Sequence, residues 1–318
     1  MKSHLDKEGR MNDAAHFEIP DDGLLRTPKK KALLLRAIRK YLELCEVDLS
    51  QPVLVLGGGQ EDMEILTACG FRQIVLSNLR TAGVALDVED IALPDNSYPT
   101  VFAHAVLHHC RCPQRAVGEM VRVSQRHTFF LEPNDSWALR TLVRLGYSFP
   151  YEIAAVAGNG YTRGGMRNGP IPNYIYRWTR DAVKDAVFAY HPERQFQVRA
   201  YPYWDFYVSE QDLLFRTESR VASLTKTIGP QTFIRLLHLA QSVLNVLPLS
   251  RAQGNKIFCA ISKGDLQPWI ENRDGNYGLK GRAESLKQFE SDASCIEIPP
   301  SVLDVQTSSG EKEMQCEK

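Results

Sequence analysis

The sequence predicts an α/β fold with a doubly wound, mostly parallel sheet, an antiparallel last strand and an inserted lid. Short, continuous apolar runs recur between residues 53 and 131 and are separated by stretches with helical spacing. Because these runs do not alternate with polar residues, they are typical of strands buried on both faces of a parallel sheet. Three glycines, Gly57 to Gly59, stand directly between the first run and a helical stretch, which indicates a strand, turn and helix in succession.

The composition limits the class of protein. The chain has 318 residues, and Lys+Arg and Asp+Glu both total 38, so the formal net charge is zero. The protein therefore has no net electrostatic attraction to nucleic acid or to an anionic membrane, and a small-molecule partner fits better. The seven cysteines are odd in number and lie mostly in apolar segments, which argues against a secreted disulfide framework. Since neither a signal-like segment nor a membrane-length apolar run is present, we expect a cytoplasmic protein without membrane insertion; the oligomeric state is left open.

The chain begins with a segment that we expect to be a flexible arm, residues 1–26, because it is polar and mixed in charge. The first helix follows, since Thr27 can cap it, Pro28 suits its first turn, and apolar residues from Leu33 to Leu42 are spaced for one buried face. We expect the main domain to span residues 27–264 and a polar tail to span 265–318.

The strands of the main domain follow from the apolar runs in chain order. The runs lie at 53–56, 74–76, 86–88, 101–106 and 128–131, with helical spacing after the glycine turn up to Gly70 and again over 115–123. Residues 195–201 alternate as a strand, and 209–247 predict two helices separated by Gly229 and Pro230. Residues 256–262 predict the closing antiparallel strand.

Residues 134–194, after the fifth strand, predict a lid. Up to about residue 180 they are rich in Tyr, Asn, Gly and Arg and contain only short apolar stretches. Aromatic walls with hydrogen-bonding tips suit a polar small molecule, and an arginine could hold its carboxylate or phosphate. A stabilising cap whose aromatic side chains pack on one another is the equally open alternative. The candidate substrate residues are Tyr161, Arg167, Tyr174 and Tyr176.

The most specific pattern is residues 87–109, which read DVEDIALPDNSYPTVFAHAVLHH. Together with the glycine turn, this stretch resembles the class I S-adenosylmethionine-dependent methyltransferase family, in the type 11 branch that carries a "DAE-LPFPDNSFD" and "LHH" signature. The resemblance runs from about Pro52 to Pro133. It implies a Rossmann-like fold, S-adenosylmethionine as cofactor, and methyl transfer to an oxygen or nitrogen of a small molecule. The GxGxxG and GxxxxGK[ST] patterns are missing, which excludes the dinucleotide-binding and phosphate-loop alternatives.

The resemblance also implies which residues hold the cofactor. Its methionine end would lie on the turn at 56–60, its ribose at Asn78 and its adenine at Asp87 and Val88, while His104 would line the wall near the sulfonium. The implied cofactor-binding residues are Leu56, Gly57, Gly58, Gly59, Gln60, Asn78, Asp87, Val88 and His104.

Three residues depart from the family's pattern. Val55 stands where the first strand usually carries an acid, Glu61 replaces the last glycine of the turn, and Asn78 replaces the acid that takes the ribose hydroxyls. An amide can still accept one hydrogen bond and donate another, so Asn78 predicts a weaker ribose contact. These departures keep two alternatives open: a non-methylating rearrangement or cyclisation in a biosynthetic pathway, and a catalytically inactive binding protein.

Catalysis by a general base is optional, because methyl transfer chiefly needs the nucleophile in line with the methyl carbon. The candidate bases are His109 and His108, followed by Glu132, and the alternative is that the histidines only shape the cofactor pocket. The string from His108 to Cys112 also raises a zinc site. Because neighbouring residues rarely converge on one tetrahedral ion and no second Cys or His pair stands at ligand spacing, we expect no metal.

Overall fold

The structure is a computed structural model that describes residues 17–18, 32–78, 85–206, 220–273 and 276–280. The chain divides into two units, residues 1–265 and 266–318. The second unit contains an antiparallel hairpin of β8 (Ile270–Arg273) and β9 (Asn276–Leu279). All the residues that the sequence implicates in binding or catalysis lie in the first unit.

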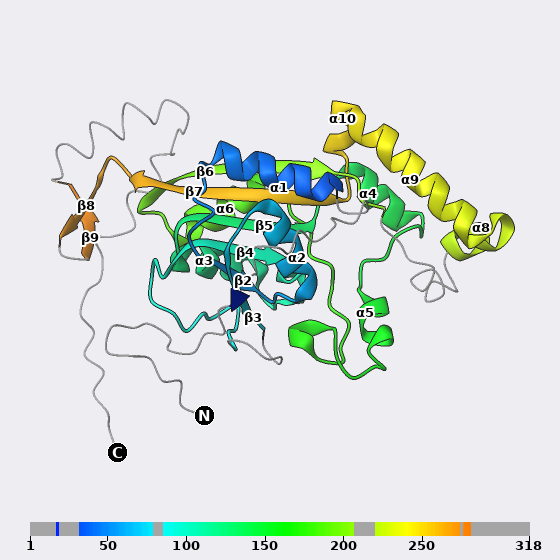
Figure 1. Ribbon diagram of the computed structural model, residues 1–318, viewed down its shortest axis with the longest axis horizontal. Coiled ribbons are helices and arrows are strands. Elements are labelled where there is room, and N and C mark those ends of the chain that lie inside the picture. Colours follow the sequence, from blue (N-terminus) through cyan, green and yellow to red (C-terminus); the bar gives the residue numbers. More distant parts are fainter. Residues whose placement is uncertain (1–16, 19–31, 79–84, 207–219, 274–275, 281–318) are drawn as a thin grey trace, which may run out of the picture. The chain divides into compact units, whose positions relative to one another are not determined.

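A seven-stranded sheet is the centre of the first unit, with strand order β1-β3-β2-β4-β5-β7-β6 (Figure 1). Strands β3, β2, β4 and β5 run parallel, whereas β7 is antiparallel to β5 and β1 is antiparallel to β3. The strands are β1 (Phe17–Glu18), β2 (Val53–Leu56), β3 (Gln73–Ser77), β4 (Tyr98–His104), β5 (Ser124–Pro133), β6 (Arg194–Tyr203) and β7 (Lys256–Leu266). The expected mostly parallel sheet with an antiparallel last strand at 256–262 is confirmed.

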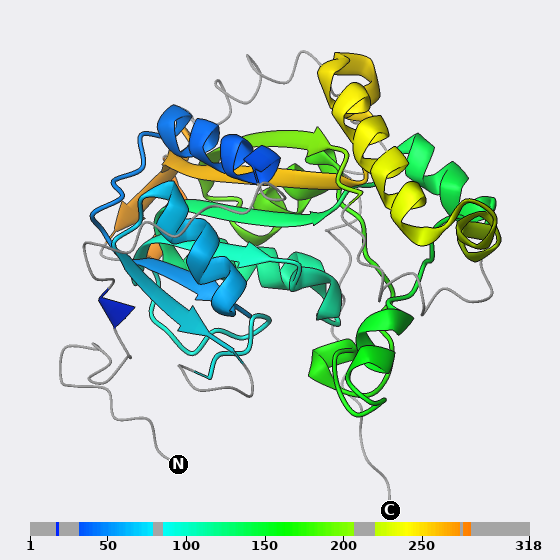
Figure 2. The same cartoon turned by 45° about the vertical axis from the view of Figure 1, so that its right-hand side comes forward.

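Helices cover both faces of this sheet because successive strand residues point to opposite sides (Figures 1 and 2). Val53 and Val55 of β2 pack on the face of α1 (Ala32–Leu44) and α2 (Gln60–Cys69). Leu54 and Leu56 pack on the opposite face with α3 (Pro113–Val123) and α6 (Arg180–Tyr190). All four β2 side chains are fully buried, which accounts for the unbroken apolar run.

Residues 134–194 are divided between a covering segment and the core. Helix α4 (Trp137–Arg144), helix α5 (Ile153–Gly158) and the short 3₁₀ turn η3 (Met166–Asn168) lie beyond the carboxyl ends of the central strands (Figure 2). Helix α6 instead packs beside α3 and buries Val183 and Val187 in the core. The expected lid boundary at 194 is therefore wrong, since the last helix of the segment completes one layer of the sheet.

Two other expectations about the elements need correction. Residues 86–88 form no strand; an isolated bridge joins Asp87 to Asp90 in a tight turn. The turn forms because the Asp87 carboxylate accepts the backbone N–H of Glu89. This N–H group therefore does not need a hydrogen-bond partner on a neighbouring strand. The β4 strand ends at His104 rather than at Val106. The Thr27 cap, Pro28 and most of the arm and tail lie outside the described residues.

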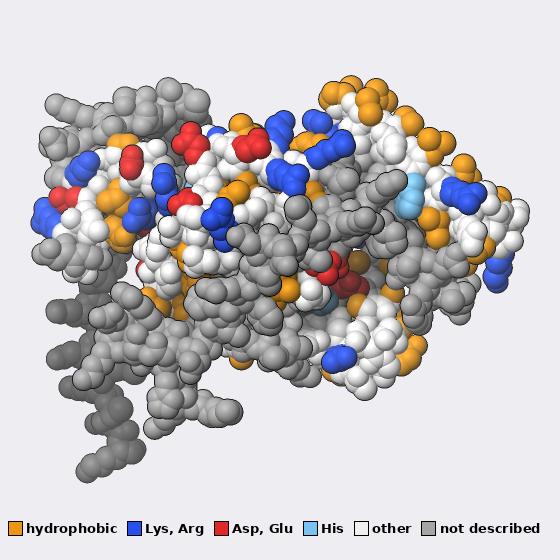
Figure 3. Space-filling view, viewed as in Figure 1, with side chains coloured by type: hydrophobic (Ala, Val, Ile, Leu, Met, Phe, Trp, Pro, Cys, Tyr) orange, Lys and Arg blue, Asp and Glu red, His pale blue; other side chains and the backbone are white. Residues whose placement is uncertain are grey.

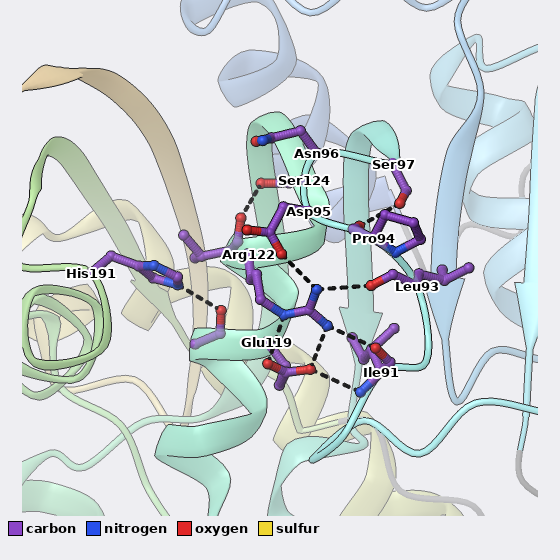
Figure 4. A network of polar contacts seen from close by, with 12 residues as sticks. Ile91, Leu93, Pro94, Asp95, Asn96, Ser97, Glu119, Arg122, Ser124 and His191 are labelled. Atoms are coloured by element: carbon purple, nitrogen blue, oxygen red, sulfur yellow. Dashed lines mark hydrogen bonds and ion pairs between the residues drawn. The ribbon is translucent and has the colours of Figure 1, made fainter. Parts of the chain in front are cut away.

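The loop between the Asp87 turn and β4 is fastened to α3 by one arginine (Figure 4). The guanidinium of Arg122 donates to the backbone oxygens of Ile91 and Leu93, at 2.7 and 2.8 Å, and to Asp95 and Glu119. Glu119 in turn accepts the N–H of Ile91 at 2.9 Å. The "LPDNS" part of the signature therefore anchors the loop, and this places the Asp87 turn near the sheet edge.

The chain between β6 and β7 forms helices α8 (Arg220–Ile228), α9 (Pro230–Val246) and α10 (Pro248–Ala252). The two helices expected around Gly229 and Pro230 are confirmed over residues 220–246, while 209–219 lie outside the described residues. Among the described residues, no helix combines the length and the apolar character needed to cross a membrane.

Candidate functional site

The glycine turn follows β2 at the edge where three parallel strands end. Leu56 is in register with Ser77 of β3 and with Ala103 of β4, so Asn78 and His104 both lie beside the turn. Gly57 has a φ of 64°, and a Cβ there would overlap the side chain of Val106. A Cβ on Gly59, by contrast, would meet no atom of the described residues within 4 Å, its two chain neighbours aside. The turn is thus tightly packed at Gly57 and open at Gly59, where α2 begins.

The open position lies at a helix N-terminus, a place that favours an anionic group. The N–H groups of Gly59, Asp62 and Met63 already have acceptors within this turn. The N–H of Gly58 donates to the carbonyl of Ser77 at 3.0 Å, and the Asn78 amide lies 3.5 Å from the Gly58 carbonyl. The hydroxyl oxygen of Ser77 is buried without a hydrogen-bond partner. These contacts bring the predicted residues Gly58, Gly59 and Asn78 together at one place.

A buried carboxylate, missed by the sequence reasoning, connects the turn to β4. Asp62, in the first turn of α2, accepts the N–H of Gly59 at 3.0 Å and contacts Nδ1 of His104 at 2.8 Å. Asp62 is buried, so it fixes the orientation of the His104 ring next to the glycine turn. The sequence contained a signal for this contact, because an acidic residue three positions after the N-cap of a helix, as Asp62 is after Gly59, commonly accepts the N–H of the cap residue.

Asp87, predicted to meet adenine, is held by the covering segment. One carboxylate oxygen accepts from Glu89 N–H at 3.0 Å, and the other accepts from the guanidinium of Arg167. Arg167 also lies 3.6 Å from Glu89, whose carboxylate accepts the N–H groups of Arg111 and Cys112 at 3.1 and 2.7 Å. Arg167 therefore bridges the covering segment to the turn that carries Asp87.

The predicted adenine-covering role of the Val88 side chain does not fit its position. Val88 belongs to the buried core on the α3 face, so its backbone alone can border a ligand. The expectation for Asp87 remains open, because a carboxylate oxygen has two lone pairs and can accept a second donor.

The signature histidines form a buried cluster with two glutamates. They lie in the 3₁₀ turn η2 (Leu107–His109) after β4. Nδ1 of His108 contacts Glu132 at 2.5 Å, and its Nε2 lies 3.2 Å from Glu152. Nε2 of His109 lies 3.4 Å from the same Glu152 oxygen, while its Nδ1 contacts the carbonyl of Gly165 at 3.2 Å. His108 and His109 thus meet a carboxylate that lies 44 and 43 residues later in the sequence, which sequence spacing does not reveal.

The protonation states of His108, His109 and Glu152 depend on their burial and on the charged groups beside them. Burial alone would lower the pKa of His108, but the carboxylates of Glu132 and Glu152 outweigh it and raise the pKa to about 9. The pKa of His109 is lowered, first by burial and then by the adjacent His108. Burial opposes ionisation of Glu152, yet the two histidines hold its pKa below the usual value. In the form without other ligands, His108 is charged and His109 neutral at pH 7.

Glu132, predicted as the second-choice general base, positions neighbouring groups of the chain instead. Its oxygens accept the N–H groups of Val106 and Leu107 at 2.9 and 2.7 Å, besides contacting His108. Because Glu132 is buried and holds these three donors, it shapes the turn after β4 and does not face a substrate.

The predicted substrate residues are distributed around the covering segment. Tyr176 accepts a hydrogen bond from Gln114 at 2.7 Å and packs edge-on against Trp178, so it supports the cap. Tyr174 packs edge-on against Tyr151, and both are half exposed. Tyr161 is mostly exposed. Of the four, Arg167 contacts a predicted cofactor residue, Asp87.

The surface is hollowed beside the segment that carries α5, and acidic and histidine side chains gather in that hollow (Figure 3). Within the cluster of His108, His109 and Glu152, the side chains of His109 and Glu152 are partly exposed. A small molecule can therefore reach charged groups at this place.

S-adenosylmethionine fits the glycine end of the site. A Cβ at Gly57 or Gly58 would overlap neighbouring side chains, whereas Gly59 leaves free space at the start of α2 for the methionine end of the cofactor. At the other end, Arg167 already contacts Asp87, so the predicted hydrogen bond from the adenine amine would have to share this carboxylate with Arg167. Glu61, which replaces a glycine of the family's pattern, lies in the first turn of α2.

Comparison with known proteins supports the same assignment. Residues 33–131 match the family model described as "Methyltransferase domain". No curated protein matches the chain. Among solved structures, YcgJ from Bacillus subtilis is 10% identical, with 73% of this chain and 97% of that chain covered and a TM-score of 0.40.

Two further solved structures are similar at the same level. A SAM-dependent methyltransferase from Archaeoglobus fulgidus is 12% identical, covers 74% of this chain and 94% of its own, and has a TM-score of 0.38. Magnesium protoporphyrin IX methyltransferase from Synechocystis, with bound SAH, is 9% identical, with 74% and 84% covered and a TM-score of 0.39. The match over residues 33–131 identifies this part of the chain as a methyltransferase domain, the type of domain that uses S-adenosylmethionine as its cofactor.

Proposed function

We propose that the protein transfers a methyl group from S-adenosylmethionine to an oxygen or nitrogen of a small-molecule acceptor. The observation that carries this proposal is the glycine turn, which is closed by Val106 at Gly57 and open at Gly59, at the carboxyl ends of β2, β3 and β4. Ligands of open α/β sheets bind at this edge.

When bound, S-adenosylmethionine supplies an electrophilic methyl carbon on a sulfonium. The chain's own residues would bind and orient: the N-terminus of α2 favours the carboxylate, and Asn78 offers an amide to the ribose. His104, oriented by Asp62, would line the wall beside the turn. Holding the acceptor in line with the methyl carbon supplies most of the rate in such a displacement.

Where the acceptor must lose a proton, His109 is the best placed of the three predicted bases. Glu132 is buried and already contacts two backbone N–H groups and His108, and both ring nitrogens of His108 face carboxylates. The His109 side chain is partly exposed, so it can reach a bound molecule.

The covering segment supports a polar acceptor. Arg167 and Glu152 contribute charges of opposite sign, and the half-exposed Tyr151 and Tyr174 contribute flat faces with hydroxyl tips. The formal net charge of zero favours a small-molecule partner over nucleic acid, and we propose a cytoplasmic location for the protein.

Calorimetry with S-adenosylmethionine and S-adenosylhomocysteine tests the cofactor part. In the Gly59→Ser variant, the added side chain enters space that no atom of the described residues uses, its two chain neighbours aside, and serine is a favourable helix cap, so the fold is retained. We expect the variant to bind both compounds more weakly by about tenfold or more, which corresponds to ~1.4 kcal/mol. Gly278→Ser, at another glycine with free space around its Cβ position, is the matched control and should bind as the wild type does.

Methyl transfer itself is tested with a methyl-labelled cofactor and a panel of small hydroxyl- and amine-containing acceptors. Labelled product supports the proposal. Unlabelled, rearranged product would instead support the non-methylating alternative. Failure of both compounds to bind at millimolar concentration would favour a binding protein in which Arg167 permanently occupies Asp87.

A further inference from the structure

We infer that His108, His109 and Glu152 form a binding site for a divalent transition-metal ion. One potential ligand atom from each residue lies within 4.8 Å of the other two. The Glu152 oxygen Oε2 lies 3.2 Å from Nε2 of His108 and 3.4 Å from Nε2 of His109. Ligand atoms at about 2.0 Å from a tetrahedral zinc ion are separated by about 3.3 Å, so both distances suit ligands of one ion.

The second ring nitrogen of each histidine already has the partner that metal-binding histidines use. Nδ1 of His108 contacts the buried Glu132 carboxylate, and Nδ1 of His109 contacts the Gly165 carbonyl. With each Nδ1–H donated to these acceptors, the neutral imidazole presents a lone pair on Nε2. Carboxylate and carbonyl partners of this kind fix the tautomer and the ring orientation of histidine ligands.

In the metal-free form the charged His108 is the cation of the cluster, and a bound metal ion would take the place of its Nε2 proton beside Glu152. The Oε2 atom of Glu152 is buried and has no hydrogen bond of acceptable geometry, although both Nε2 atoms are close to it. The side-chain oxygen of Asn173 is likewise buried without a partner. Asn173 is adjacent to the cluster, since its backbone oxygen accepts the N–H of Glu152 and its side chain donates to the backbone of His108. Buried acceptors without donors are costly, and a bound cation removes that cost.

The backbone of the covering segment keeps the third ligand in place. A Cβ on Gly165 would overlap the carbonyl of Ile171, and the N–H of Gly165 donates to Gly169 at 2.9 Å. Glu152 is fixed at the other side of the segment by its N–H bond to Asn173. The ligands therefore come from two rigidly held turns rather than from free side chains.

Two imidazoles and one carboxylate select a transition metal over calcium or magnesium, which prefer oxygen ligands alone. Three protein ligands leave at least one coordination position open, and the partial exposure of His109 and Glu152 makes it accessible from solvent. If the proposed methyl transfer holds, that position can take an oxygen or nitrogen of the acceptor, and His109 then serves as a ligand and not as a base. The metal site itself does not depend on that function.

The test uses untagged full-length protein, treated with a chelator and titrated with Zn²⁺ by calorimetry and with Co²⁺ by visible absorption. We expect one equivalent of each ion, with d–d bands of a nitrogen and oxygen environment for Co²⁺. Glu152→Gln and His109→Gln should each weaken binding by at least about tenfold, since even partners of metal ligands change affinity by 10 to 100-fold. Circular dichroism without metal checks that each variant is folded.

A matched pair of variants controls for non-specific effects. His191 and Glu193 form another histidine and glutamate pair, 3.6 Å apart, so His191→Gln and Glu193→Gln remove the same chemical groups elsewhere. Both should bind the ions as the wild type does. The inference is overturned by the absence of stoichiometric binding, by unchanged binding in folded Glu152→Gln and His109→Gln, or by intense thiolate-to-cobalt bands that indicate ligation by a cysteine such as the exposed Cys112. Because these measurements involve no cofactor or acceptor, their result is independent of whether methyl transfer occurs.

Discussion

The side chain of Arg167 competes, by position, with the adenine that Asp87 is proposed to bind. Its guanidinium donates to the carboxylate of Asp87 and lies near Glu89. Arg167 is about two-fifths exposed, so solvent weakens the pair and the guanidinium can leave at modest cost. Asp87 thus has two alternative donors, the guanidinium of Arg167 and the proposed exocyclic amine of adenine.

Substitution of each partner separates their contributions to cofactor binding. Asp87→Ala should weaken S-adenosylmethionine binding by about 1–3 kcal/mol, because a charge-assisted hydrogen bond to the adenine amine is lost. Arg167→Met should leave binding equal or strengthen it, because the carboxylate is then free for the amine. Calorimetry on both variants measures the difference. Equal weakening in both would show that Arg167 helps to hold the cofactor, and no change in Asp87→Ala would place the adenine elsewhere.

His127 predicts a pH dependence of stability. It is buried on β5, where burial first and Arg126 and Arg199 second lower its pKa to about 4, from 6.5 in the unfolded chain. The unfolded chain therefore binds more protons between pH 6.5 and 4, so the free energy of unfolding falls as the pH falls through this window. The loss is about 3 kcal/mol at most for this shift.

A His127→Gln variant measures that effect, since its amide is neutral at every pH and can still bond to Ser262, which lies 3.1 Å from the His127 ring. Urea titrations between pH 4 and 7 should give a smaller fall in unfolding free energy for the variant than for the wild type. Parallel curves would mean that His127 is protonated in the folded state at the same pH as in the unfolded chain.

At the scale of elements, the clamp between α3 and the loop at 91–95 decides where the Asp87 turn lies. Arg122 satisfies two backbone carbonyls and two carboxylates with one planar group. Lysine carries the same charge but cannot reproduce this fork of donors. The loop therefore depends on an arginine and not on a positive charge alone.

Arg122→Lys should lower the free energy of unfolding by about 1–3 kcal/mol, because buried carbonyls lose their donors. Arg115→Lys is the matched control, since Arg115 lies 3.6 Å from Asp90 at an exposed place where ion pairs contribute little. Urea unfolding of both variants tests the contrast. Equal effects would show that the clamp acts through charge only.

At the scale of the whole molecule, the sheet was predictable because each strand's signal is local. The runs at 53–56, 128–131 and 256–262 lie within β2, β5 and β7, since strands buried on both faces must be apolar throughout. The strand predicted over 86–88 does not form, because the Asp87 carboxylate accepts the N–H of Glu89 and stabilises a turn instead. Hydrophobicity alone does not reveal this competition between a side chain and strand pairing for the backbone N–H group.

The site was predictable to a different extent. The glycine turn, Asn78 and His104 meet because parallel strands end at one edge, a consequence of topology that the sequence pattern already contains. The contacts of Glu152 with the histidines and of Arg167 with Asp87 join residues distant in sequence. Such contacts depend on how the covering segment folds back, and no local pattern of residue types encodes that path.

The difference between sheet and covering segment also predicts how the molecule opens. The central strands β2, β4 and β5 are buried on both faces, whereas residues 145–176 contain one short helix and many exposed side chains. Hydrogen exchange should therefore be slowest in the central strands and much faster in 145–176, which can open while the sheet stays folded. S-adenosylhomocysteine should slow exchange at the glycine turn and the start of α2 and leave residues 256–262 unchanged, because the ligand contacts the former only. Uniform protection across the first unit would instead indicate that the segment and the sheet open as one cooperative structure.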